Sequence, residues 1–217
     1  VLIPTFNNST YVRRIIPQLH DIGLQNIVLV ENAPTAPEML TFLQSVQNDD
    51  IVVRRDHNAG PRDLFMSAEN YNRLPEIFCI TDPDLEFNSA LPDEFLLGLI
   101  DATEKFKTGK AGMALDIADR EAMRDEDFIY GNRPYKIWDW ESQFWRHQVG
   151  TTPAGDPIYN APIDTTFAVY NKKYFRPETH LLGVRVAGRY TCRHLPWYKD
   201  VAMPASEEEY YRQHQKY

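Results

Sequence analysis

The stretch IFCITDPD, residues 77–84, decides the fold class of this chain. Its first five residues form a continuous apolar and β-branched run, which is typical of a strand buried on both faces of a parallel sheet. The run ends abruptly at Asp82, Pro83 and Asp84. Ligands of open α/β sheets bind beyond the carboxyl ends of the strands, so these two carboxylates stand where a ligand is expected.

Similar strand-like runs lie before and after this one. The predicted strands are residues 1–6, 27–30, 51–53, 77–81 and 111–115. Apolar residues at helical spacing occupy the segments between them, which are residues 12–22, 37–46, 64–71 and 91–106. This alternation predicts an α/β fold with a mostly parallel sheet, helices on both of its faces and right-handed crossovers.

The alternation stops after about residue 116. Further strands are expected at 163–170 and 184–192, and a capped helix begins near Ser206. No linker or internal repeat interrupts the sequence, so residues 1–217 are expected to form a single domain with a regular half (1–115) and an irregular half (116–217). The abrupt stop of the tail helix suggests the first module of a longer protein.

Composition narrows the class of partner. The chain has 23 Lys and Arg against 31 Asp and Glu, and the resulting net charge of −8 argues against nucleic acid or an anionic membrane surface as a partner. No apolar run reaches the roughly 20 residues that cross a bilayer, and no secretory leader precedes the first strand. The two cysteines, Cys79 and Cys192, lie in strand-like runs, which suits a reducing compartment. A cytoplasmic location is expected.

The acidic pair at residues 82 and 84 favours a metal site. Two carboxylates one residue apart repel each other unless a cation lies between them. Mg²⁺ and Mn²⁺ prefer carboxylate oxygens, combined with the oxygens of a substrate diphosphate. Polar residues also follow the other early strands, which makes a nucleotide a plausible ligand. The competing interpretation of Asp82 and Asp84 is an ordinary turn.

Four segments, in this order and spacing, resemble the nucleotide-sugar half of GT-A fold glycosyltransferases, family 2 in particular. The segments are residues 2–7, 27–32, 58–60 and 82–84, and the resemblance covers about residues 1–115. It implies a Rossmann-like, three-layer α/β/α sandwich whose irregular second half binds the acceptor. It also implies a nucleoside-diphosphate-sugar donor, with a UDP-sugar favoured by family habit, and a glycan or glycoconjugate acceptor.

The resemblance also implies which residues contact the donor. Thr5, Glu31, Asn58 and Arg62 are expected near the base and ribose. The full set of predicted nucleotide-sugar-binding residues is Pro4, Thr5, Phe6, Glu31, Asn32, Arg55, Asn58, Gly60, Arg62, Asp82 and Pro83. A Mn²⁺ or Mg²⁺ ion is expected on Asp84, Asp82 and His194, because many GT-A enzymes bring a late histidine to the metal and imidazole is a competent Mn²⁺ ligand.

The catalytic base is less well determined. Residues 160–167 resemble the acceptor-side strand of some family 2 members, which makes Asp164 the first candidate for deprotonating the acceptor hydroxyl. A strand-end cap or an acceptor-binding group is the competing role for Asp164. Asp139 and Glu141 are rival bases. The Glu-Asp pair usual downstream of the acceptor strand is missing, which leaves the base and the stereochemical outcome open.

Two further groups of residues each have two interpretations. A basic stretch in and just after the last predicted strand contains Arg185, Arg189 and Arg193. Either one of these cations neutralises the departing diphosphate or the three form a solvated strand face. Three indole rings either stack on sugar faces or pack in the core; they are Trp138, Trp140 and Trp145.

The leading hypothesis is a metal-dependent glycosyltransferase of the hexosyltransferase type. A sugar nucleotidyltransferase is a weaker alternative, because it should carry a glycine-rich basic loop after the first strand and residues 7–10 contain neither glycine nor a cation. A phosphatase of the haloacid dehalogenase type fits poorly, because its nucleophile normally follows the first strand. A non-catalytic module that binds sugar nucleotides or glycans also remains open.

Overall fold

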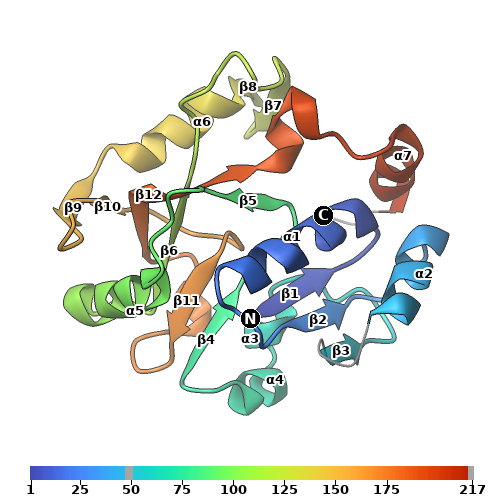
Figure 1. Cartoon of the computed structure of the whole chain (residues 1–217), viewed down its shortest axis with the longest axis horizontal. Helices are drawn as coiled ribbons and strands as arrows, with labels where there is room; N and C mark the ends of the chain where they lie inside the picture. The colour runs from blue at the N-terminus through green and yellow to red at the C-terminus, as the bar shows by residue number, and fades with distance from the viewer. Residues whose placement is uncertain (47–50, 215–217) are drawn as a thin grey trace.

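The computed structural model describes residues 1–46 and 51–214, and a long mixed sheet runs through them (Figure 1). The order of its strands is β3-β2-β1-β4-β11-β6-β12-β10-β9, with β5 paired to β12. The first half of the chain builds the parallel part from β1 (Leu2–Thr5), β2 (Val28–Glu31), β3 (Ile51–Arg54) and β4 (Ile77–Ile80). The four strands predicted first are therefore confirmed, as is the α/β class.

Helices follow the early strands as the spacing predicts. They are α1 (Ser9–Asp21), α2 (Pro37–Ser45), α3 (Asp63–Met66), α4 (Ala68–Arg73) and α5 (Phe95–Phe106). The prediction of a single helix over residues 64–71 is wrong, because the backbone adopts an extended conformation at Ser67 (φ −75°, ψ 120°) and separates α3 from α4. The Ser67 hydroxyl accepts a hydrogen bond from the Asn70 amide at 3.4 Å and so caps α4.

Beyond β4 the sheet becomes mixed. Strand β11 (Ala168–Asn171) lies between β4 and β6 (Lys110–Leu115) and is antiparallel to both, while β12 (Val184–His194) is parallel to β6. The strand predicted over 163–170 therefore begins five residues late, and residues 161–167 form a loop. Because β11 is antiparallel, this loop reaches the edge of the sheet where β1, β2 and β4 have their carboxyl ends.

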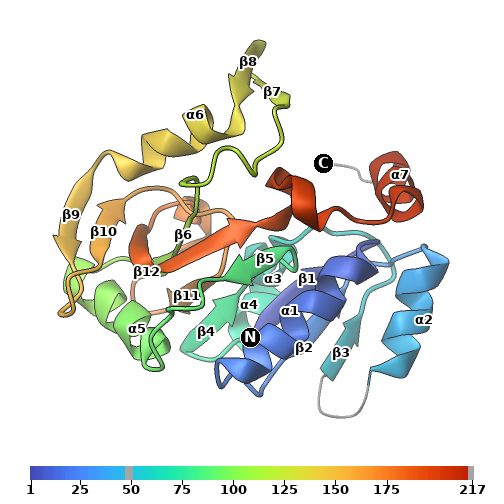
Figure 2. The same ribbon diagram turned by 45° about the horizontal axis from the view of Figure 1, so that its top comes forward.

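The structure contains elements that the sequence did not predict, and all but the first of them lie in the second half. They are β5 (Leu85–Phe87), β7 (Asp127–Tyr130), β8 (Arg133–Lys136), α6 (Ile137–Ser142), β9 (Gln148–Thr151) and β10 (Pro157–Asn160). Short 3-10 turns lie at Gln143–Trp145, Pro177–Thr179, Leu195–Trp197 and Lys199–Val201. The β7–β8 hairpin stands away from the rest of the molecule (Figure 2). The tail helix is α7 (Ala205–His214), and its predicted stop near residue 217 lies outside the described residues.

Two apolar cores cover the two faces of the sheet. Leu29 and Cys79 belong to the core that α1, α2 and α5 cover, whereas their neighbours Val30 and Phe78 belong to a second core, which includes residues of α3. Adjacent residues of one strand point to opposite faces, so the arrangement has three layers with helices on both sides. Cys79 and Cys192 are both buried and not disulfide-bonded. None of the helices in the described part of the chain has the length and apolar character to cross a membrane.

Candidate functional site

A pocket of about 200 Å³ opens at the carboxyl ends of the parallel strands. The residues that line it are Pro4, Thr5, Phe6, Asn8, Asn32, Asn58, Pro61, Asp82, Pro83, Asp84 and Tyr211. They come from the end of β1, from the segments after β1, β2, β3 and β4, and from α7. Seven of the predicted donor-binding residues line this pocket together with the predicted metal ligand Asp84, whereas Asn8, Pro61 and Tyr211 were not predicted.

Several polar atoms of this pocket are buried without a hydrogen-bond partner. They are Oδ1 of Asn8, Oδ1 of Asn32 and Oδ1 of Asp84. Buried polar atoms in folded proteins nearly always have partners, so orphaned acceptors gathered in one cavity indicate a site for donors or for a cation. This chemistry suits a polar ligand accompanied by a metal.

The Asp82 carboxylate is held in place by the loop that precedes β11. The Asp82 amide donates to the Thr165 carbonyl at 2.9 Å, and the Thr165 hydroxyl donates to Asp82 Oδ2 at 2.7 Å. Burial raises the pKa of Asp82 to about 7, and the negative charge of Asp84 contributes in the same direction. The carboxylates of Asp82 and Asp84 therefore repel each other in the absence of a cation.

His194 approaches the same acidic pair from the end of β12. Its Nε2 lies 3.3 Å from Asp84 Oδ2, and its buried Nδ1 has no hydrogen-bond partner. Burial lowers the pKa of His194, but the carboxylates of Asp84 and Asp82 outweigh it, so the net pKa is raised. The predicted trio of Asp82, Asp84 and His194 is thus brought together.

The ligand atom types of this trio suit a divalent ion. It offers carboxylate oxygens and an imidazole, and Oδ1 of Asp84 is unpartnered. His194, however, is turned onto Asp84, and across residues 1–46 and 51–214 no three His, Cys, Asp or Glu side chains are arranged to hold a metal. A metal here needs additional oxygens from a ligand.

Asp164, the first candidate base, lies in the loop before β11 and is paired with Arg62. Arg62 Nε donates to Oδ1 at 3.0 Å and Nη2 donates to Oδ2 at 2.7 Å. Both side chains are about half exposed, at 48% for Arg62 and 53% for Asp164. The pair connects the segment after β3 to the loop before β11.

The two rival bases differ in environment. Glu141, in α6, forms an ion pair with Arg185 of β12, with side-chain exposures of 4% and 7%. Burial raises the pKa of Glu141, although the Arg185 charge and hydrogen bond act against it. Arg185 also donates from Nε to the Pro162 carbonyl at 2.7 Å. Asp139 is exposed on α6.

Four predicted donor-binding residues are not among those that line the pocket: Glu31, Arg55, Gly60 and Arg62. Glu31 lies 3.5 Å from the Arg54 guanidinium, and Arg55 pairs with Asp63. Gly60 has a φ of +78°, which favours glycine, and its amide donates to Asn58 Oδ1 at 3.0 Å. Gly60 therefore shapes the turn that presents Asn58 to the pocket.

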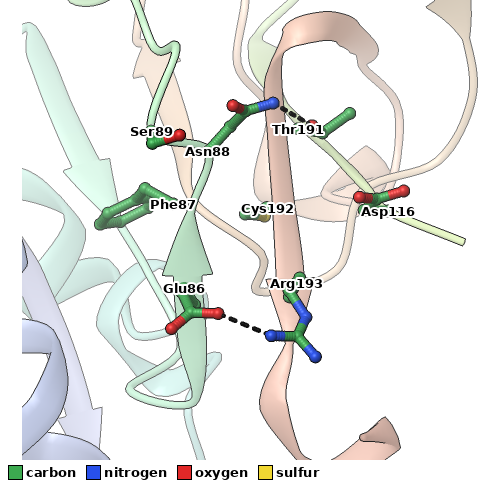
Figure 3. A pocket seen from close by; sticks show the side chains of 8 residues that line it. All are labelled: Glu86, Phe87, Asn88, Ser89, Asp116, Thr191, Cys192 and Arg193. Carbon is green, nitrogen blue, oxygen red and sulfur yellow. Dashed lines mark hydrogen bonds and ion pairs between the residues drawn. The ribbon is translucent and has the colours of Figure 1, made fainter. Parts of the chain in front are cut away.

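The other two arginines of β12 are each paired with carboxylates. Arg189 makes a bidentate pair with Asp156, at 3.1 and 2.7 Å. Arg193 donates to Glu86 at 3.0 Å and to Asp200 at 3.0 Å. Figure 3 shows the Arg193–Glu86 pair at one end of a second cavity, between β5 and β12, whose walls also carry Asp116 and Thr191.

The three tryptophans, for which sugar stacking and core packing were both open, have protein partners. Trp140 contacts the rings of Phe128, Tyr130, Tyr135 and Phe144. Trp145 packs 5.7 Å from the Tyr159 ring, and Trp138 packs against the small core that contains Tyr198. These contacts agree with the packing interpretation.

Helix α7 supplies the wall that sequence reasoning missed. The Tyr211 and Phe6 rings meet edge to face with centroids 6.3 Å apart. Glu207 accepts hydrogen bonds from the Ser9 hydroxyl and the Thr10 amide, each at 3.0 Å. The sequence indicated the helix itself, but nothing local in it indicated that the helix packs on α1.

Comparison with known proteins gives a distant structural likeness only. No protein-family profile matches the sequence, and no curated protein matches it. Among solved structures, the chain is similar to residues 1–349 of S. aureus TarS, a GT-A glycosyltransferase, with a TM-score of 0.45 and 12% identity over 82% of this chain and 50% of that chain. The chain thus spans about half the length of that solved chain. So distant a likeness says nothing about what this chain binds or transfers.

Proposed function

We propose that this chain is a glycosyltransferase that binds a nucleoside-diphosphate sugar in the pocket at the strand ends. The observation that carries the proposal is the meeting of Asp82 and Asp84 with the orphaned oxygens of Asn8 and Asn32 in one cavity. Strand-end carboxylates that repel each other call for a cation, and a sugar nucleotide supplies the further oxygens that such a cation needs.

The metal is proposed to be Mn²⁺ or Mg²⁺, held by Asp84, Asp82 and His194. When bound, the ion supplies charge neutralisation for the nucleoside diphosphate as it leaves. The unpartnered Oδ1 of Asp84 is available to the ion directly. Thr165 fixes the orientation of Asp82 through its 2.7 Å hydrogen bond.

The base and ribose are proposed to lie against Phe6, Asn32 and Asn58. Phe6 offers an apolar ring, and the amide groups of the two asparagines can pair with ring or ribose hydroxyl atoms. Thr5 and Pro4 close the floor of the pocket, both being buried at the end of β1. A UDP-sugar is the favoured donor.

Asp164 is proposed as the base that takes the proton from the acceptor hydroxyl as this oxygen attacks the anomeric carbon. Its loop is tied to Asp82 through Thr165, which keeps the carboxylate close to the acidic pair. Glu141 is a weaker candidate, because its carboxylate is buried against Arg185. Asp139 remains the rival base on an exposed turn of α6.

A binding module without turnover is the second candidate. One observation favours it: the carboxylate of Asp164 is already occupied by Arg62 in a bidentate pair. A protein that binds a sugar nucleotide and does not transfer the sugar would need no free base.

The test measures thermal stabilisation by UDP-glucose, with and without Mn²⁺, and then UDP release in the presence of an oligosaccharide acceptor panel. We expect stabilisation that depends on Mn²⁺ and is lost in Asp84→Asn. The matched control is Asp116→Asn, a strand-end carboxylate that lines the second cavity and not this pocket. Binding without UDP release favours the module. If UDP, GDP and dTDP sugars all fail to stabilise the wild-type protein, the proposal is wrong.

A further inference from the structure

The Arg62–Asp164 pair joins two segments that are 102 residues apart in the sequence. Arg62 immediately precedes α3, beside the pocket residue Pro61, and Asp164 belongs to the acceptor-side loop. The Asp82 carboxylate is near enough to Arg62 to raise its pKa, although Asp164 contributes more. Arg62 is therefore a cation at the rim of the pocket.

The backbone around Asp164 is fixed, so only its side chain has freedom. The Lys110 ammonium donates to the Ile163 carbonyl at 2.6 Å and to the Asp164 carbonyl at 3.1 Å. On the other side, Thr165 is bound to Asp82 through both backbone and side chain. Loss of the Arg62 contact would leave Asp164 in place with a free carboxylate.

Arg62 can exchange Asp164 for another anion at little cost in stability. Both partners are about half exposed, and exposed ion pairs contribute little to stability. A diphosphate carries more charge than a carboxylate and offers oxygens that match the guanidinium fork. The other arginines near the site are engaged elsewhere: Arg55 with Asp63 and Arg185 with the buried Glu141.

We propose that the Arg62–Asp164 pair is a latch that the diphosphate of the donor opens. In the donor-free protein Arg62 occupies the carboxylate of Asp164. When a nucleoside diphosphate enters, Arg62 exchanges its partner and binds the phosphate oxygens, which frees Asp164 for the acceptor hydroxyl. The inference rests on the proposed function and adds to it an order of events, in which the donor binds before the acceptor can be deprotonated.

The test is a double-mutant cycle on ligand affinity, measured by calorimetry. The proteins are wild type, Asp164→Asn, Arg62→Gln and the double variant. The probes, all titrated in the presence of Mn²⁺, are UDP, inorganic pyrophosphate and uridine. If the latch exists, Asp164→Asn releases Arg62 in advance and tightens UDP and pyrophosphate binding about two- to fivefold. Uridine has no phosphate, so its affinity stays the same.

Measurements in the Arg62→Gln background distinguish the latch from the general effect of removing a negative charge near the anion. Removal of any nearby negative charge favours an anion, but a gain that operates through Arg62 disappears when Arg62 is absent. If Asp164→Asn tightens binding equally in both backgrounds, or not at all, the latch is wrong. If pyrophosphate binding shows the Arg62-dependent gain but UDP does not bind, the latch is supported and the proposed donor is wrong. Failure of both UDP and pyrophosphate to bind overturns both.

Discussion

The Lys110 ammonium donates a hydrogen bond of 2.6 Å to the carbonyl of Ile163, and its side chain is completely buried. Lys110 is the first residue of β6, and its nitrogen also lies 5.1 Å from the centre of the Tyr170 ring. Burial lowers the pKa of Lys110 to about 7, despite the opposing charge of Asp164. The loop before β11 is thus held by a lysine whose charge is costly to bury.

The first prediction concerns the pH dependence of stability at Lys110. Between pH 7 and its ordinary pKa of 10.5, the folded protein has released this proton and the unfolded chain still binds it. The free energy of unfolding therefore rises with pH in this window. Lys110→Met lacks this contribution, so wild type should gain about 1–3 kcal/mol relative to the variant between pH 7 and pH 10. Urea denaturation across this range measures the difference.

The control for that series is Lys105→Met, which removes an exposed lysine of α5. It reports the general effect of losing one positive charge. If the difference in unfolding free energy between wild type and Lys110→Met stays constant from pH 7 to pH 10, the buried amine keeps its proton.

The second prediction concerns Asp82. Its pKa of about 7 lies above its ordinary value of 3.8, so between these values the folded protein holds a proton that the unfolded chain has lost. Stability therefore falls as the pH rises through this window. Asp82→Asn removes the contribution and should make the metal-free protein about 1–2 kcal/mol more stable at pH 7.5, with little change at pH 4. The same variant should lose Mn²⁺-dependent binding of UDP-glucose.

Thermal unfolding in EDTA at pH 7.5 and pH 4 measures the effect on stability. Thermal stabilisation by UDP-glucose in Mn²⁺, without EDTA, measures the effect on binding. The side-chain amide that Asp82→Asn introduces keeps an oxygen that can accept from the Thr165 hydroxyl, so the loop contact survives. A variant that is less stable than wild type at pH 7.5 in EDTA would contradict the predicted cost of the buried charge.

The third prediction concerns the Glu141–Arg185 ion pair. Loss of one partner of a buried pair leaves the other charge without compensation, which costs about 3–5 kcal/mol. Glu141→Gln should therefore destabilise the protein strongly, and adding Arg185→Met should restore part of the loss. UDP-glucose binding at low temperature should survive in the folded fraction. The Arg185→Met single variant completes the cycle. Equal effects of Arg185→Met in the wild-type and Glu141→Gln backgrounds would show that the two charges are not coupled.

The fourth prediction concerns Asp156, in the turn between β9 and β10. Hydrogen bonds from Arg189, and from Thr152, lower its pKa to about 2, despite partial burial. The contribution to stability is present above pH 4 and is lost as the pH falls towards 2. Asp156→Asn should cost about 1–2 kcal/mol at pH 7, and the gap to wild type should close below pH 3. Chemical denaturation at pH 7, 4 and 2.5 measures the gap.

The parallel part of the fold and its pocket could be predicted from local pattern. Apolar runs such as residues 77–81 identify buried strands, and the rule that ligands meet carboxyl ends led to Asp82, Asp84 and Asn32. The direction of β11 could not be predicted in this way. An antiparallel strand brings the residues before it, not after it, to the same edge, and Asp164 and Thr165 reach the site for that reason.

The partners of the charged residues could not be predicted either. The three arginines of β12 look alike in the sequence, yet one is buried against Glu141 and the others bind Asp156 and Glu86. Such pairings depend on contacts between segments that are far apart along the chain. The position of α7 is the extreme case, because the Glu207–Ser9 contact spans 198 residues.

Helix α7 contacts the N-terminal half through Glu207, which accepts hydrogen bonds from the Ser9 hydroxyl and from the amide and hydroxyl of Thr10. Tyr210 adds a hydrogen bond to the Thr35 hydroxyl, and the Tyr211 ring packs against Phe6. Tyr211, on the same helix, forms one side of the pocket. Detachment of this helix would expose the pocket without breaking any strand pairing. The amides of α7 should therefore exchange with deuterated solvent through a local opening of low free energy, whereas the amides of β1 and β4 should exchange only through global unfolding. A ligand that contacts Tyr211 would then slow exchange across α7 even though the helix lies outside the sheet.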